Sequence, residues 1–70
     1  MKISARNQLK GKVASIQEGA VTSIVVVDIG NGNRITSSIT NNAVKELGLT
    51  VGADAYAIIK ASSVMIGIDD

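Results

Sequence analysis

Apolar and polar residues alternate along two segments of the chain, and this alternation predicts two half-buried β-strands. The first segment, Leu9–Ile16, places Lys10 and Lys12 on the polar face. Its inward face is expected to carry Leu9, Gly11, Val13 and Ser15. The second segment, Arg34–Ile39, is expected to turn Ile35, Ser37 and Ile39 inward.

A further strand is predicted between these two. Val21–Ile29 contains the β-branched run Ile24–Val27, and β-branched side chains favour strands. Both faces of this strand are apolar, so both should be covered, either by the core or by another subunit. The Gly30–Asn33 segment has the composition of a hairpin loop, which predicts that the strand runs antiparallel to Arg34–Ile39.

A short helix is predicted over Thr40–Gly48. Thr40 or Asn41 can cap its N-terminus, and Gly48 suits the left-handed position that follows a helix. Val44 and Leu47 are three residues apart and are expected to share the inward face.

Two more strands are predicted, at Ala55–Lys60 and Val64–Ile68. Five short strands with one helix between the third and the fourth are typical of an OB-like Greek-key barrel. The expected fold class is therefore all-β with one short helix, in a single domain spanning residues 1–70. A β-sandwich fits less well, because it usually needs more strands and a longer chain.

Composition narrows the chemistry. The 70 residues contain no cysteine and no histidine, which excludes disulfides, thiolate metal sites and the commonest general base. We therefore expect no direct cation ligands, no organic cofactor and no catalysis. So small a domain usually needs a further source of stability, and oligomerisation is the one left open.

Charge and hydropathy argue against two classes of partner. One aromatic residue, Tyr56, and a net charge of +1 give no footprint for nucleic acid. No apolar run is long enough for a membrane span. We expect a cytoplasmic protein.

Three polar clusters fall at the ends of the predicted elements, and each offers hydrogen-bond donors without a carboxylate. Arg6 supplies a fixed fork of donors, and Lys60 follows an apolar strand. Thr40 could donate its hydroxyl while the amides of Asn42 and Ala43 point at another oxygen of the same ligand. The three clusters are Ser4-Ala5-Arg6, Thr40-Asn41-Asn42-Ala43 and Lys60-Ala61-Ser62-Ser63.

Each cluster also has a purely structural interpretation. The first could be a solvated arm, the second a simple helix cap, and the third a lysine that reaches water from a sheet edge. Together they suit a tetrahedral dianion, whose oxygens accept hydrogen bonds and donate none.

The sequence resembles the molbindin family, the Mop-type, TOBE-like proteins that bind molybdate and tungstate. The resemblance is carried by Ser4–Val13, Ile39-Thr40, Leu47-Gly48-Leu49 with Gly52, Ile59-Lys60-Ala61 and Val64-Met65. It implies an OB-like barrel, a homohexamer built as a trimer of dimers, and oxyanions at subunit interfaces. It places the ligands on Ser4, Arg6, Thr40 and Lys60, with help from the regions of Ala43 and Ser62. Some members of the family carry serine where this chain has Ala43, so one hydroxyl contact is absent here.

The resulting hypothesis is binding and storage of molybdate or tungstate at the interfaces of a homo-oligomer. The alternatives are an OB-fold module that binds nucleic acid, a purely structural assembly module and a small enzyme that relies on carboxylates. The scattered acids Asp28, Asp54, Asp69 and Asp70 offer no acid–base pair at a meaningful spacing.

Overall fold

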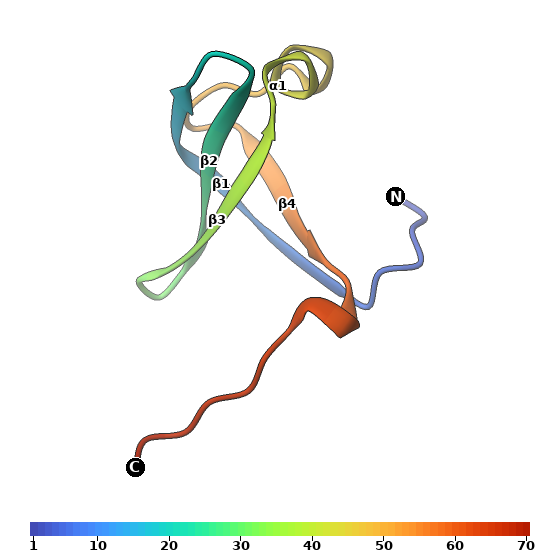
Figure 1. The fold of residues 1–70 in the computed structure, drawn as a ribbon, viewed down its shortest axis with the longest axis vertical. Helices are drawn as coiled ribbons and strands as arrows, with labels where there is room; N and C mark the ends of the chain where they lie inside the picture. Colours follow the sequence, from blue (N-terminus) through green and yellow to red (C-terminus); the bar gives the residue numbers. More distant parts are fainter.

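The computed structural model describes residues 1–70 as one antiparallel sheet with a short helix at one end (Figure 1). The sheet has four strands in the order β3-β2-β1-β4 and curls into an OB-like half-barrel. The elements are β1 (Asn7–Glu18), β2 (Thr22–Gly30), β3 (Asn33–Thr40), α1 (Asn41–Leu47), β4 (Asp54–Ile59) and a 3₁₀ turn, Ala61–Ser63. Four of the five predicted strands and the helix between Thr40 and Gly48 are confirmed, with bounds that move by one or two residues.

Strand β1 is shared between two partners. Its first half, Asn7–Lys12, pairs with β4, and its second half, Lys12–Glu18, pairs with β2. A bulge between Val13 and Ser15 interrupts the pairing with β2 and reverses the alternation of side chains beyond it. The prediction that Ser15 faces inward is therefore wrong, because Ser15 is exposed and Ile16 packs against the core instead.

The β2–β3 hairpin turns at Asn31-Gly32. Both residues have positive φ, 55° and 77°, as a two-residue turn between twisted strands requires. This confirms the hairpin that composition predicted.

Helix α1 is capped at both ends. Thr40 is the N-cap, and its Oγ1 accepts a hydrogen bond from the Ala43 amide at 3.1 Å. Gly48 has a left-handed φ of 63° at the C-terminal end, as expected. Val44 packs against the core, and Leu47 lines an apolar groove between β3 and β4 but stays 68% exposed there.

The core is very small. Only five of the 70 residues are buried, and the apolar ones are Val13, Val25, Val27 and Ala57. On the other face of β2, Ile24 remains 39% exposed. The core of a single chain therefore does not cover both faces of this strand.

The predicted fifth strand, Val64–Ile68, is not part of the sheet. The chain leaves the sheet through the turn Ala61–Ser63 and continues as an extended segment that pairs with no strand (Figure 1). Met65, Ile66 and Ile68 are 92%, 89% and 91% exposed. The closed five-stranded barrel is therefore wrong for the isolated chain, because a strand forms only where another edge receives its hydrogen bonds.

Candidate functional site

Two of the three polar clusters meet at one end of the sheet. Asn7 begins β1 and pairs with Ile59, the last residue of β4, so the arm before Asn7 and the turn after Ile59 leave the sheet side by side. The side chain of Asn7 strengthens this junction, since its Nδ2 donates to the Ile59 carbonyl at 3.2 Å. Arg6 and Lys60 thus come from neighbouring strand ends.

The N-terminal arm is held by its own backbone. The Nε2 of Gln8 donates to the Ala5 carbonyl at 3.0 Å, and Ala5 is half-buried between the exposed Ser4 and Arg6. On the other strand, the Ala61 carbonyl accepts the Val64 amide at 3.3 Å and closes the turn that presents Ser62. Through their carbonyl oxygens, Ala5 and Ala61 therefore hold the backbone beside the donor residues Arg6 and Ser62.

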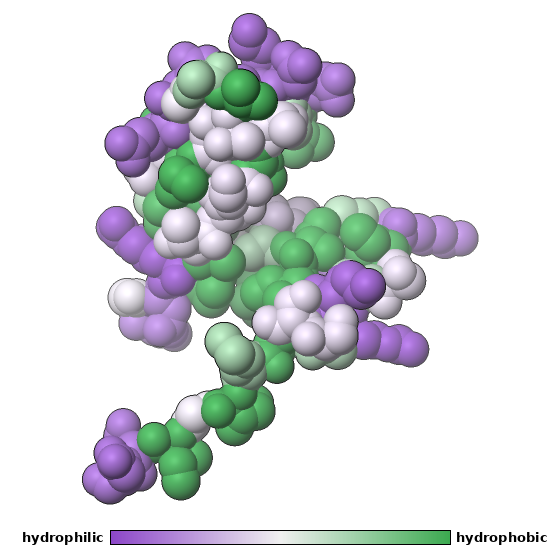
Figure 2. Space-filling view, viewed as in Figure 1, coloured by the Kyte–Doolittle hydropathy of each residue, from purple (hydrophilic) through white to green (hydrophobic).

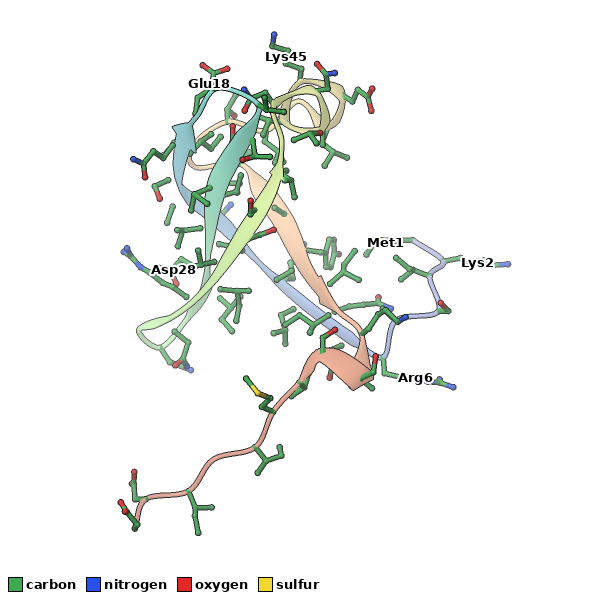
Figure 3. The ribbon with its side chains drawn as sticks, in the orientation of Figure 1. Met1, Lys2, Arg6, Glu18, Asp28 and Lys45 are labelled. Carbon is green, nitrogen blue, oxygen red and sulfur yellow. The ribbon has the colours of Figure 1, made fainter.

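No carboxylate neutralises the two cations. The single ion pair of the molecule joins Lys12 Nζ to Asp54 Oδ1 at 2.7 Å, in the middle of β1. Arg6 extends into solvent at the lower end of the sheet (Figure 3), far from the acids Glu18 and Asp28 labelled there. This end of the chain can therefore offer positive charge and hydroxyl donors to an anion.

The remaining cluster, Thr40-Asn41-Asn42-Ala43, lies at the opposite end of the sheet. Thr40 ends β3 and pairs with Thr22 at the start of β2, and β2 in turn pairs with the last residues of β1. At about 3.3 Å per residue, the 12 residues of β1 separate its two ends by about 36 Å. One chain therefore does not bring Thr40, Asn42 and Ala43 together with Arg6 and Lys60.

Asn41 fixes the start of the helix, a role that the sequence did not reveal. The hydroxyl of Ser23, which is only 1% exposed, donates to Asn41 Oδ1 at 2.5 Å. Asn41 Nδ2 then donates to the Gly19 carbonyl at 2.9 Å, and the Asn41 amide donates to the Val21 carbonyl at 2.9 Å. The signal in the sequence was a lone serine in an apolar strand, which suggests a buried hydroxyl with a partner.

The cap decides which donors remain for a ligand. The Ala43 amide is already used by Thr40 Oγ1, so it does not offer the free donor that the sequence suggested. Thr40 accepts in this bond and keeps its hydroxyl hydrogen, and the first-turn amide of Asn42 has no partner within the helix. A hollow of about 400 Å³ lies beside these residues, and its lining includes Glu18 and Lys45, which carry opposite charges. Figure 3 labels both side chains near α1.

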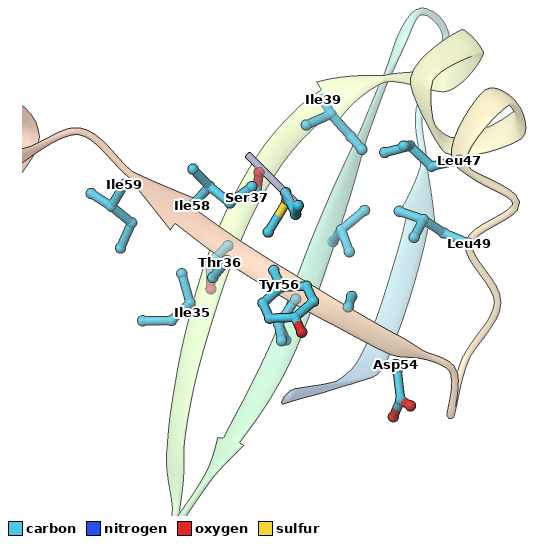
Figure 4. A pocket seen from close by; sticks show the side chains of 15 residues that line it. Ile35, Thr36, Ser37, Ile39, Leu47, Leu49, Asp54, Tyr56, Ile58 and Ile59 are labelled. Atoms are coloured by element: carbon cyan, nitrogen blue, oxygen red, sulfur yellow. The ribbon is translucent and has the colours of Figure 1, made fainter. Parts of the chain in front are cut away.

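The larger hollow of the molecule is not suited to an anion. It is a groove of about 460 Å³ between β3 and β4, and 12 of its 15 lining residues are hydrophobic (Figure 4). Its one charged lining residue is Asp54, whose pKa is lowered from its ordinary value because Lys12 donates a hydrogen bond to it and adds its charge. The groove has the character of an unfilled core.

No group of three or more acids, histidines or cysteines is arranged to hold a metal ion. None of the helices has the length and apolar character needed to cross a membrane.

Comparison with known proteins gives full-length matches. Residues 3–66 match the family model of the TOBE domain. The chain is 64% identical over 69 residues to the probable molybdenum-pterin-binding protein of Haemophilus influenzae, covering 99% of this chain and all of that protein. It is 53% identical over 66 residues to molybdenum-pterin-binding protein 2 of Clostridium pasteurianum, covering 94% of this chain and 97% of that one.

Solved structures share the fold. MopII from Clostridium pasteurianum superposes with a TM-score of 0.88 at 51% identity, covering 96% of this chain and all of that one. The cytoplasmic molybdate-binding protein ModG, in a form with molybdate bound, gives a TM-score of 0.92 at 48% identity. That match covers 99% of this chain and 49% of the ModG chain.

Proposed function

The chain belongs to the TOBE-domain family, and from this membership and its donor clusters we propose that it binds molybdate or tungstate without catalysis. ModG and a protein from Sporomusa ovata with the same fold are molybdate-binding proteins, which supports the choice of oxyanion. The observation that carries the proposal is the pairing of Arg6 and Lys60 at adjoining strand ends, with hydroxyls beside them and no carboxylate partner.

Molybdate suits these donors. It is a dianion with four oxygens that accept hydrogen bonds, and charge-assisted hydrogen bonds are about twice as strong as neutral ones. Ser4, Ala5 and Arg6 form one wall of the proposed site and Lys60, Ala61 and Ser62 the second. Thr40, Asn42 and the Ala43 turn form the third. Tungstate has nearly the same size and charge, so the same cage is expected to take both.

Each site is proposed to lie between chains. The two ends of β1 are about 36 Å apart, so a cage with all three walls needs the Arg6 end of one chain and the Thr40 end of another. Repetition of this contact around symmetry axes gives several equivalent sites, and a homohexamer is the expected assembly. The proposed role is storage and homeostasis of the anion in the cytoplasm, where the relative ModG acts.

Several relatives are named for molybdenum-pterin rather than for molybdate. A pterin is a flat aromatic ring that would gain most from stacking, and the one aromatic side chain here, Tyr56, lies in the middle of β4 rather than among the donors. We therefore propose the inorganic anion as the ligand.

Calorimetric titration of the full chain with molybdate tests the proposal, with sulfate and phosphate as competitors. We expect saturable binding in the wild type and a loss of about 10- to 150-fold in affinity for Arg6→Ala or Lys60→Ala, since a hydrogen bond to a charged group contributes about 1.5–3 kcal/mol. Lys10→Ala is the matched control, because Lys10 is exposed on β1 away from both clusters. No heat from molybdate or tungstate with the wild type would refute the function, and equal losses for all three variants would refute the site.

A mixing experiment tests whether the site is shared between chains. Arg6→Ala removes the Arg6 half of the site, and Thr40→Val removes the Thr40 half. When the two variants are co-expressed in equal amounts, about a quarter of the sites should join an intact Arg6 half from one variant to an intact Thr40 half from the other and so bind the anion. Thr40→Ser, which keeps both the cap and the hydroxyl, should bind like the wild type and so separates loss of the donor from loss of the cap. Mixed oligomers with no recovered binding would show that each site lies within a single chain.

A further inference from the structure

The tip of the β2–β3 hairpin joins two residue types in a way that the rest of the chain does not repeat. Of the five asparagines, at positions 7, 31, 33, 41 and 42, only Asn31 is followed by glycine. The backbone nitrogen of the next residue can attack the side-chain amide carbon of an asparagine. Every other residue type shields that nitrogen with its side chain, whereas Gly32 has none. The covalent surroundings of Asn31 therefore favour this attack more than those of the other asparagines.

Hydrogen bonding separates Asn31 from the other asparagines as well. Two of them donate from their side chains to backbone carbonyls elsewhere in the fold, namely Asn7 and Asn41. The remaining two lie within β3 and α1. By contrast, none of the side-chain, turn or loop hydrogen bonds of the molecule involves the Asn31 side chain or the Gly32 amide. The attacking nitrogen and the attacked carbon are thus both free of partners.

Open space surrounds the tip. Asn31 and Gly32 are exposed, and a Cβ built on Gly30 or on Gly32 would meet no atom within 4 Å. The tip projects at the end of the hairpin far from α1 (Figure 1), and the surface there is mostly hydrophilic (Figure 2). Ring closure requires the peptide plane between Asn31 and Gly32 to rotate until the nitrogen faces Asn31 Cγ. This rotation displaces no packed side chain, and exposed loop tips are the more mobile parts of a fold.

We propose that Asn31 is a site of spontaneous covalent modification, namely deamidation through a cyclic imide. The Gly32 nitrogen gives up its proton and attacks Asn31 Cγ, and the bond from Cγ to the side-chain nitrogen breaks as ammonia leaves with that proton. Water then opens the ring at one of its two carbonyl carbons. One opening leaves aspartate at position 31, and the other leaves isoaspartate, whose main chain runs through Cβ and Cγ. Water is the one co-reactant, and nothing is oxidised or reduced.

The two products differ in what they do to the hairpin. Both add a carboxylate, which is ionised at neutral pH because its pKa is about 3.9, so the net charge of the chain falls from +1 to 0. Aspartate keeps the backbone of the turn. Isoaspartate lengthens by one carbon a two-residue turn whose geometry sets the register of β2 and β3. The isoaspartate form should therefore loosen the hairpin, while the aspartate form should keep it.

Incubation of the full chain in mildly alkaline buffer tests the proposal without any ligand, so its outcome is independent of the proposed anion binding. Mass spectrometry of the peptide that contains residue 31 should show a growing gain equal to the replacement of NH₂ by OH, in two separately eluting products. Asn31→Asp supplies the standard for the aspartate product, and isoelectric focusing should show the loss of one positive net charge. A wild-type chain that is modified at residue 31 when unfolded in urea, but not when folded for the same time, would overturn the proposal.

Gly32→Ala provides the second measurement, because a methyl group on residue 32 shields the attacking nitrogen. This variant should lose most of the modification. Gly52→Ala is the matched control, since Gly52 also has a positive φ, 90°, and open space around it, but it follows a valine. It should deamidate at Asn31 as the wild type does. Equal rates in the two variants, or modification at Asn33 as fast as at Asn31, would show that the Asn31-Gly32 pair does not determine the site.

Discussion

Gly11 is the position where the structure predicts the largest effect of a single methyl group. A Cβ built on Gly11 would lie 2.2 Å from the Asp28 carbonyl oxygen and 3.0 Å from Val27 Cγ1. The first of these neighbours is backbone on the adjacent strand, so no side-chain rotation can relieve the contact. Gly11→Ala must therefore push β1 away from β2 next to the Lys12–Asp28 pair.

The size of the effect follows from this geometry. The strands must separate by at least 0.8 Å to bring 2.2 Å to the 3.0 Å below which Cβ contacts are essentially not seen. Overpacking of this kind costs about 1–3 kcal/mol, and a lost ladder hydrogen bond adds about 1 kcal/mol. Alanine returns about 0.4–1 kcal/mol by restricting the unfolded chain, so the net loss is expected to be about 2 kcal/mol.

Urea unfolding followed by circular dichroism measures this loss. Protein concentration must be equal for all variants, because assembly makes the midpoint depend on it. Gly67→Ala makes the same chemical change where nothing lies within 4 Å and φ is not positive, and it should stay within about 0.5 kcal/mol of the wild type. A Gly11→Ala midpoint equal to that of Gly67→Ala would show that β1 and β2 do not approach as closely as described.

Three further substitutions test other parts of the structure. Ser23→Ala removes the donor to Asn41 Oδ1 and should cost about 0.5–1.5 kcal/mol of unfolding free energy in urea, and an unchanged midpoint would contradict the bond. Gly32→Ala forces a methyl group onto a φ of 77° and should cost about 1–2 kcal/mol in the same assay, with strain as its only cause because no atom lies within 4 Å. The pKa of Asp54 is lower in the folded protein than its ordinary 3.8, because Lys12 pairs with the carboxylate. This pair therefore stabilises the fold at pH values above 3.8. Its contribution is lost as the pH falls through the pKa of the folded state. Thermal melts should accordingly show a small deficit for Asp54→Asn at neutral pH that vanishes in acid, and a deficit that persists in acid would assign it to another cause.

Local patterns in the sequence were sufficient for most of the fold. The β-branched run in β2, the glycines of the hairpin and the capping residues of α1 each act through their own backbone angles or nearest neighbours, so these elements were predicted correctly. Ser15 was misplaced because a bulge depends on the pairing of two strands and leaves no mark on one of them. The segment Val64–Ile68 was expected to pair within the sheet because its composition favours a strand, but composition does not say which edge receives it.

The donor clusters show a similar division. Residue type alone indicated that Arg6, Thr40 and Lys60 could contact an anion, and topology then showed that only the first and third share an end of the sheet. The Ser23–Asn41 bond was missed because its partners are 18 residues apart and belong to different elements. Likewise, the Ala43 amide was predicted to be free for a ligand, because the sequence does not show that Thr40 Oγ1 accepts its hydrogen bond.

The length of β1 has a consequence for how substitutions combine. Residues more than about 7–10 Å apart with no shared partner contribute additively to stability, so changes at the Arg6 end and at the Thr40 end of one chain should add when unfolding is measured. If the proposed site joins these ends across two chains, the same pair of changes should not add when affinity is measured. The two changes would then have independent effects on the unfolding free energy and coupled effects on anion affinity. A double-mutant cycle measured on each quantity would give different coupling energies, and that difference would report the contact between chains.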